Sequence, residues 1–223
     1  MKKALKKIHS RHKIVWTKDN VKSLAVSVGF FIVALIALKI SNNYVVSIKG
    51  TAVDDLFLNH LPTVDIDEFI IQASLLVTFL GTFLVLSKPK YLNFGLKALA
   101  VFIITRAFFI SLTHLGPSPH ELLFTDKNTW GFWLYNVMYN TKNDFFFSQH
   151  TGIPILTALI FWPEKPWRYF FLLTSVVFGA SVLLARIHYS IDVFAAPFIT
   201  YSIYAFCRYF FAKDYNTSRK LET

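Results

Sequence analysis

Two short polar clusters, at residues 144–151 and 186–192, interrupt the long apolar runs in the second half of the chain. The first contains His150, and the second contains His188 and Asp192. A carboxylate that hydrogen bonds one ring nitrogen of a histidine fixes the tautomer and leaves the other nitrogen available as a nucleophile or base. A second histidine can protonate a leaving oxygen and then deprotonate the incoming acceptor. We therefore interpret the two clusters as one histidine site for phosphoryl chemistry.

The spacing of these residues predicts how the chain must present them. His188 and Asp192 are four residues apart, so on a helical turn their side chains would share one face. If the apolar stretch between the clusters crosses a bilayer twice, both clusters emerge on the same side and can meet. A single interfacial histidine is more often structural, so the functional interpretation depends on the two clusters meeting.

Several polar residues around the histidines are candidates for binding phosphate or substrate. The start of the helix predicted to carry His150 has free backbone N–H groups and the positive end of the helix dipole, which favour an anion. In the second cluster, Arg186 could contact phosphate or anchor its helix at the interface, and Tyr189 follows His188 directly. The candidates in the first cluster are Asp144, Ser148 and Gln149, with Thr151 beside them.

Arg106 lies near the middle of another apolar run. An arginine at bilayer depth costs about 2.5–3.5 kcal/mol on insertion scales, so it normally faces a partner or a wet cavity. We expect it to be an anion anchor below the site, with a structural ion pair or a snorkelling side chain as the alternative.

A metal centre is a weaker interpretation of the same residues. Two histidines and one aspartate could ligate zinc with water as the fourth ligand. No third histidine or paired carboxylate accompanies them, although His114 and His120 in a predicted outer loop keep the option open. We predict no metal and no cofactor.

The composition indicates a membrane protein rather than a soluble domain. Hydrophobic residues make up 54% of the 223 residues and charged residues only 16%, whereas soluble domains carry about 25% charge. The apolar residues fall in long runs without amphipathic alternation, which is typical of helices surrounded by lipid. The net charge of +10 comes without a nucleic-acid motif, and anionic lipids and topology explain it better. Cys207 is the single cysteine, so no disulfide can form within the chain.

The apolar runs predict an all-α, polytopic membrane protein whose six transmembrane helices form a bundle. Residues 1–22 would be a basic cytoplasmic segment, 23–212 the catalytic membrane domain and 213–223 a cytoplasmic tail. The predicted spans are residues 24–38, 69–86, 98–115, 148–162, 169–187 and 191–211.

The distribution of Lys and Arg predicts the orientation of this bundle. Basic residues crowd the first 22 residues, the short connectors and the tail, whereas the loop at 41–68 contains only Lys49. The excess of positive charge on the cytoplasmic side therefore places both termini inside and both polar clusters at the outer leaflet. The aromatic residues of the long outer connection favour an interfacial belt or a pocket for a quaternary ammonium head group. They are Trp130, Trp133, Tyr135 and Tyr139.

At the two clusters the chain also resembles a known family. Asp-x-x-x-Ser-x-His-Thr at 144–151 and His-Tyr-Ser-x-Asp-Val at 188–193 resemble the third and fourth motifs of the sphingomyelin synthases. These enzymes belong to the wider phosphatidic acid phosphatase type 2 superfamily. Arg106 and the segment 116–119 are loosely similar to an earlier motif, and the resemblance covers about residues 70–212.

The resemblance implies roles for the matching residues. His188 would attack the substrate phosphorus, Asp192 would orient His188, and His150 would serve as acid and then as base, without a metal. The donor would be a phospholipid and the acceptor a ceramide- or diacylglycerol-like alcohol, whereas the phosphatases of the superfamily use water.

Some residues depart from the family pattern. Lys and Asn at 142–143 replace Cys-Gly, and Gln149 replaces a glycine that would let phosphate approach the backbone. Val182 stands where the phosphatase signature has arginine, which favours the synthase-like branch.

Three functions therefore stay open at the level of the sequence. The first is a phosphotransferase that moves a phospho-head group between lipids. The second is a hydrolase that releases phosphate or a phospho-head group. The third is a non-enzymatic lipid-binding or transport protein.

Overall fold

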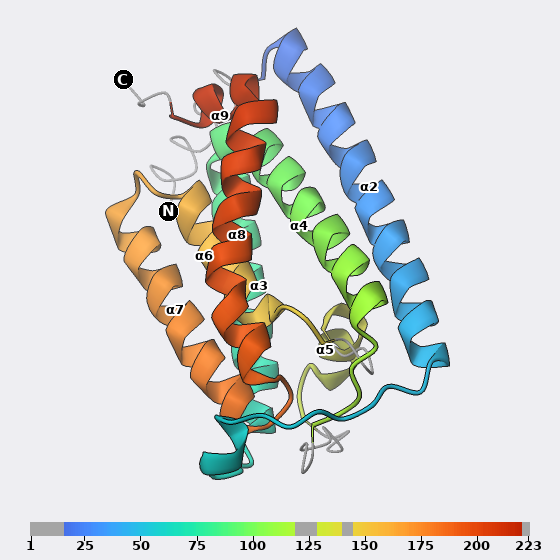
Figure 1. Ribbon diagram of the computed structural model, residues 1–223. Helices are drawn as coiled ribbons and strands as arrows, with labels where there is room; N and C mark the ends of the chain where they lie inside the picture. The colour runs from blue at the N-terminus through green and yellow to red at the C-terminus, as the bar shows by residue number, and fades with distance from the viewer. Residues whose placement is uncertain (1–15, 119–128, 140–144, 220–223) are drawn as a thin grey trace.

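The computed structural model describes residues 16–118, 129–139 and 145–219, which form a bundle of helices without a strand in these ranges (Figure 1). The long helices run side by side, and the short α5 lies at the lower end of the bundle in this view. The helices are α2 (Lys18–Ser47), α3 (Asp67–Ser87), α4 (Leu92–Thr113), α5 (Phe132–Met138), α6 (Gln149–Ile160), α7 (Lys165–Leu184), α8 (Ser190–Phe210) and α9 (Ala212–Arg219), with 3-10 turns η1 (Leu58–His60) and η2 (Pro89–Tyr91).

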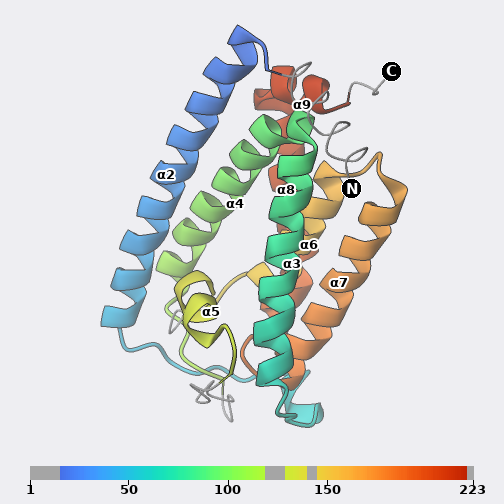
Figure 2. The ribbon, with the colours of Figure 1, turned by 180° about the vertical axis from the view of Figure 1, so that it is seen from behind.

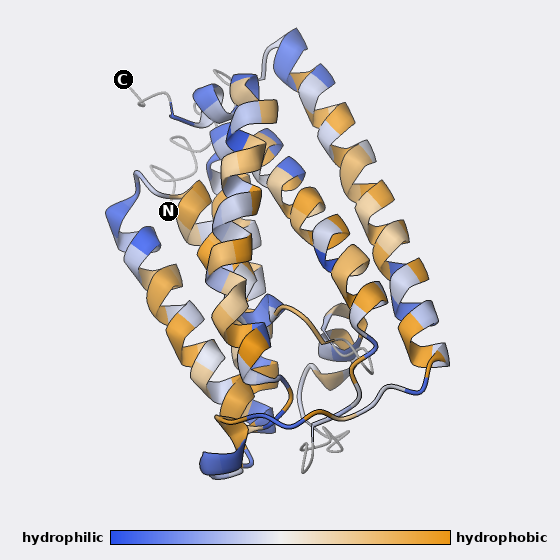
Figure 3. Ribbon diagram, in the orientation of Figure 1, coloured by the Kyte–Doolittle hydropathy of each residue, from blue (hydrophilic) through white to orange (hydrophobic). Residues whose placement is uncertain are grey.

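Five helices in the described part are long and apolar enough to cross a membrane: α2, α3, α4 together with η2, α7 and α8. Apolar residues colour the middle of the bundle and hydrophilic residues gather toward its ends (Figure 3). An all-helical integral membrane protein is thus supported.

The span predicted at 148–162 differs from the others. It is the 12-residue helix α6, which is roughly 18 Å long at 1.5 Å per residue, whereas the hydrocarbon core of a bilayer is about 30 Å thick. The six-span layout is therefore not confirmed, and the orientation of the termini stays a prediction.

The first helix is longer than predicted. The apolar run ends near residue 38, but α2 continues to Ser47 because its polar face finds partners on α4. Ser41 donates to the carbonyl of Ala107 at 2.8 Å and lies 2.7 Å from the hydroxyl of Ser111. Such pairing lets a helix carry polar residues beyond its apolar stretch.

The short helix α6 lies inside the bundle, in contact with α3, α4, α7 and α8 (Figures 1 and 2). Gly152 permits the close approach to two of these neighbours. A Cβ at this position would lie 2.8 Å from the ring of Phe102 and 3.0 Å from the hydroxyl of Thr200. The glycine thus lets α6 sit deep between α4 and α8, and this placement sets the depth of His150.

The end of the bundle that carries α9 is held by buried charges. Lys97 of α4 forms an ion pair with Asp214 of α9, and both are nearly inaccessible to solvent. Ser23 of α2 donates to the same carboxylate at 2.7 Å. Arg219 donates to two carbonyls at the C-terminal end of α6, at 2.9 and 3.2 Å. The C-terminal helix thereby anchors the end of α6 opposite to His150.

At the other end, two segments that are distant in the sequence meet at the start of α8. Gly50 and Gly116 bring their backbones together, since a Cβ on Gly116 would lie 2.7 Å from the Gly50 carbonyl oxygen. The hydroxyl of Tyr189 donates to the Gly116 carbonyl at 3.0 Å and accepts from the N–H of Val53 at 3.3 Å. Tyr189 thus joins the loop after α2 and the end of α4 to the segment that carries His188.

Candidate active site

The two polar clusters lie against each other. The N–H of Ser148 donates to the backbone carbonyl of Asp192 at 2.9 Å, so that the start of α6 is joined directly to the first turn of α8. The ring centroids of His150 and His188 are 5.9 Å apart, with an angle of 65° between the rings. Both side chains are 4% exposed. Two imidazoles from separate helices thus share one buried site.

His188 and Asp192 make contact in a different way from the one expected. His188 does not lie on a helical turn, because α8 begins at Ser190 and the N-cap residue Tyr189 has extended backbone. Asp192 occupies the third position of the helix and reaches back toward its start. Its Oδ2 accepts from the N–H of Tyr189 and lies 3.1 Å from Nδ1 of His188. One carboxylate oxygen therefore both caps α8 and orients the imidazole.

His150 is the second residue of α6 and is held by two tyrosines. Its Nε2 lies 3.1 Å from the hydroxyl of Tyr135, and the ring of Tyr139 stacks on the imidazole at 5.0 Å. Ser148 is the N-cap of the helix, and its hydroxyl accepts from the N–H of Thr151. Nδ1 of His150 is buried without a hydrogen-bond partner among the described residues. This nitrogen is available for a reacting group.

A residue with strained backbone precedes each of the two histidines of the site. Phe146 has φ of 81° and Arg186 has φ of 56°, values that side chains with a Cβ rarely adopt. Arg186 donates from its guanidinium to the carbonyls of Leu58 and Leu61, at 2.8 and 3.0 Å. Such strain costs on the order of 1–3 kcal/mol and gathers at functional sites. The surrounding structure thus holds the strained turns that place both clusters inside the bundle.

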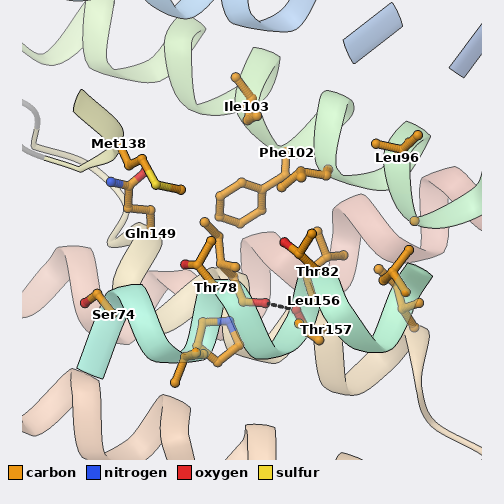
Figure 4. A pocket seen from close by; sticks show the side chains of 18 of the residues that line it. Ser74, Thr78, Thr82, Leu96, Phe102, Ile103, Met138, Gln149, Leu156 and Thr157 are labelled. Carbon is orange, nitrogen blue, oxygen red and sulfur yellow. Dashed lines mark hydrogen bonds between the residues drawn. The ribbon is translucent and has the colours of Figure 1, made fainter. Parts of the chain in front are cut away.

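A largely apolar cavity of about 560 Å³ reaches the site between α2, α3, α4 and α6. Gln149 faces it at one end, and Phe102 and Leu156 lie along its walls (Figure 4). Arg106 and His150 also line it. The volume suits a hydrocarbon chain, and the polar groups at one end suit the head of an amphipathic ligand.

Arg106 has a second role in shaping the site. It is 2% exposed, and its Nε donates to the carbonyl of Phe147 at 3.1 Å. That carbonyl immediately precedes the N-cap of α6, so the arginine helps to place His150 while lining the cavity. Phosphate binding by Arg106, Ser148, Gln149, Arg186 or Tyr189 stays a prediction. Asp144 lies outside the described residues, as does His120.

The sequence did not indicate that two tyrosines of the long connection, Tyr135 and Tyr139, contact His150. Trp130 and Trp133 are 73% and 76% exposed, as an interfacial belt requires, whereas Tyr135 is buried against His150. Tyr135 and Tyr139 are four residues apart, and this spacing was the one available sign that they share a face.

In the parts of the chain that the structure describes, no three histidine, cysteine or acidic side chains gather in a way that could hold a metal ion. Nε2 of His114, which had kept a metal option open, lies 3.1 Å from the hydroxyl of Tyr44.

Asp55, in the loop after α2, hydrogen bonds the first residue of α8. One carboxylate oxygen accepts from the N–H of Ser190 at 2.7 Å, and the other accepts from the N–H groups of Phe57 and Leu58. Partial burial raises the pKa of Asp55, but these hydrogen bonds outweigh it and lower the pKa below its ordinary value of 3.8. Because its pKa is lowered in the folded state, the ionised Asp55 contributes to folding stability above pH 3.8. This contribution is lost as the pH falls through the folded-state pKa.

We expect Asp55→Asn to lower the melting temperature in detergent at neutral pH and to lower it less in acid. The difference in melting temperature between wild type and variant should begin to decrease below about pH 4. Asp65→Asn, at an exposed position of the same loop, is the matched control and should show no such narrowing. If the difference in melting temperature stayed constant down to the lowest pH measured, the charge of Asp55 would not contribute to stability.

One comparison with known proteins gives a match in the region of the two clusters. Residues 142–209 match the family model described as PAP2 superfamily C-terminal. The match covers both clusters in full, and it supports the phosphatidic acid phosphatase type 2 superfamily, whose members are phosphatases or phosphotransferases acting on lipid phosphoesters. The searches of curated proteins and of solved structures gave no match. The narrower sphingomyelin synthase-like assignment stays a prediction.

Proposed function

We propose, on the basis of the match of residues 142–209 to the family model described as PAP2 superfamily C-terminal, that this chain is a membrane phosphotransferase. It would move a phospho-head group from a phospholipid to a lipid alcohol. Ceramide- or diacylglycerol-like alcohols would be the acceptors.

The mechanism assigns one task to each residue of the His-His-Asp site. Nε2 of His188 would attack phosphorus, forming a P–N bond while the P–O bond to the leaving alcohol breaks. His150 would donate the proton that the leaving oxygen needs. It would then take the proton from the acceptor hydroxyl, whose oxygen forms a new P–O bond as the P–N bond breaks. Asp192 would hold Nδ1 of His188 and stabilise the positive charge that develops on the ring.

The single observation that supports a transferase best is the position of His150. It lies 5.9 Å from His188 between ring centroids, and it also lines the apolar cavity. The group assigned to protonate the leaving alcohol and to activate the acceptor therefore faces a space suited to a lipid alcohol. An apolar chamber favours a hydrocarbon-bearing acceptor over bulk water.

The phosphate would be held at the same end of the cavity. Arg106 and Gln149 line it there, and Ser148 caps the helix whose first N–H groups favour an anion. Asp144 completes the proposed substrate-binding residues of the first cluster. Arg186 and Tyr189 support the turn that carries His188 through their contacts with neighbouring loops.

The charges favour an active site that opens toward the outer side. The basic residues Lys97, Lys213 and Arg219 belong to the end that carries α9. His188 belongs to the opposite end, near the acidic loop that contains Asp55. The excess of positive charge on the cytoplasmic side then places the second end outside.

Product analysis tests the proposal. The purified chain, in detergent micelles with a phospholipid labelled in its head group, should transfer label to ceramide or diacylglycerol when either is added. Little label should leave the donor without an acceptor. Release of labelled phosphate or phospho-head group with no labelled lipid product would contradict the transferase. It would favour a second candidate, a lipid phosphatase, which the family name also supports.

A further inference from the structure

His150 is held by two tyrosines, Tyr135 in α5 and Tyr139 at the end of that helix. The hydroxyl of Tyr135 lies 3.1 Å from Nε2 of the imidazole. The ring of Tyr139 stacks on Tyr135 at 5.3 Å and on His150 at 5.0 Å. The hydroxyl of Tyr139 in turn hydrogen bonds Thr78 of α3. The imidazole is therefore fixed both on one face and at one nitrogen.

The hydrogen bond from Tyr135 determines which nitrogen can react. Burial raises the pKa of Tyr135 above its ordinary value, so the phenol keeps its proton at neutral pH. A phenol both donates and accepts, and Tyr135 can therefore stay bonded to Nε2 whether His150 is neutral or charged. Nδ1 is buried without a partner in the described part of the chain. Proton transfer would therefore take place at Nδ1.

The two imidazoles of the site have partners of different charge. The partner of His188 is the carboxylate of Asp192, whose Oδ2 lies 3.1 Å from Nδ1. The partner of His150 is a neutral phenol, which orients the ring without adding a charge. Two imidazoles with different surroundings can take different roles in acid–base chemistry.

We infer that Tyr135 is a positioning residue for His150, one that occupies Nε2 and leaves Nδ1 to donate the proton to the leaving alcohol and to accept the proton of the acceptor. This inference rests on the proposed function and extends it to a residue outside both polar clusters.

Two substrates that differ in their leaving group test the inference with Tyr135→Phe. A phospholipid donor needs protonation of its alkoxide, whereas a p-nitrophenyl phosphodiester with the same head group does not. We expect kcat for the phospholipid to fall about 10- to 100-fold with little change in KM. For the nitrophenyl ester, kcat should fall by less than about threefold. Tyr201→Phe is the matched control, because Tyr201 is an exposed tyrosine of α8, and it should keep kcat for both substrates.

Equal losses for the two substrates would make Tyr135 merely structural, and unchanged kcat for both would overturn the inference. A second measurement does not depend on turnover. In protein labelled with ¹⁵N-histidine, the ring nitrogen shifts of His150, assigned with His150→Gln, should change in Tyr135→Phe and stay unchanged in Tyr201→Phe. Shifts that stay unchanged in Tyr135→Phe would also overturn the inference. Wild-type protein that turns over no lipid, together with changed shifts, would contradict the proposed function and still support the hydrogen bond that positions His150.

Discussion

Replacing His188 by alanine is expected to lower head-group transfer by about a thousandfold or more, while the protein still folds. The imidazole is the proposed nucleophile, and the second imidazole of the described site, that of His150, is assigned to proton transfer instead. The ring is small, and its aromatic neighbours in the described part of the chain include Phe145, edge-on at 6.4 Å, and His150. Its removal should therefore change the melting temperature only modestly. Turnover of labelled phospholipid and thermal unfolding in detergent measure the two effects.

His60→Ala is the matched control for this variant. His60 is an exposed histidine in the short turn η1, and its Nδ1 contacts the carbonyl of Leu56. The control should keep wild-type turnover. A His188→Ala protein that transfers head groups at more than about a tenth of the wild-type rate would show that His188 is not the nucleophile. If the variant lost no lipid-related activity at all, a binding or transport protein would be the better description.

The second large effect is expected at Asp192, where two substitutions separate charge from hydrogen bonding. In Asp192→Asn, the amide oxygen can still accept from the N–H of Tyr189 and from Nδ1 of His188, the two contacts that Oδ2 makes now. The charge that stabilises the imidazolium is lost, so kcat should fall about 10²- to 10⁴-fold. The free energy of unfolding should change little.

In Asp192→Ala, the same loss of activity should come with a loss of stability. The side chain of Asp192 is fully buried, and alanine leaves the N–H of Tyr189 without its acceptor. A buried polar group without a partner costs about 1–3 kcal/mol. The measurement is kcat together with denaturant or thermal unfolding of both variants.

Asp65→Asn, in the exposed part of the loop before α3, controls for a general effect of removing negative charge at this end. It should change neither kcat nor stability. Wild-type activity in Asp192→Asn would contradict the role of the carboxylate. Equal stability of the asparagine and alanine variants would contradict its role as the cap of α8.

The arrangement of α6 connects these predictions to the fold. A helix of 12 residues lies among longer ones, so its N-terminus ends inside the bundle instead of at its surface. His150 is therefore presented at the end of an apolar cavity, where a lipid alcohol could reach it. Gly152 at one end and the contacts of Arg219 at the other hold this depth.

Local signals in the sequence indicated the membrane-protein class and the candidate residues of the site. Long apolar runs indicate membrane helices, since lipid-facing side chains must be apolar over a whole span. The spacing of His188 and Asp192 indicated their contact, although the contact comes from capping of α8 instead of a shared helical face. The clusters around His150 and His188 also indicated the superfamily that the match at residues 142–209 supports.

Packing between distant segments decided the rest. Tyr135 and Asp55 contact the site through space, 15 and 135 residues along the chain from His150 and Ser190, and no local periodicity records such contacts. The length of α6 and the cavity beside it depend on how four other helices surround them. Hydropathy reports whether a segment prefers lipid to water, whereas the depth of a helix end and the partner of each buried nitrogen depend on the shapes of side chains brought together by the fold.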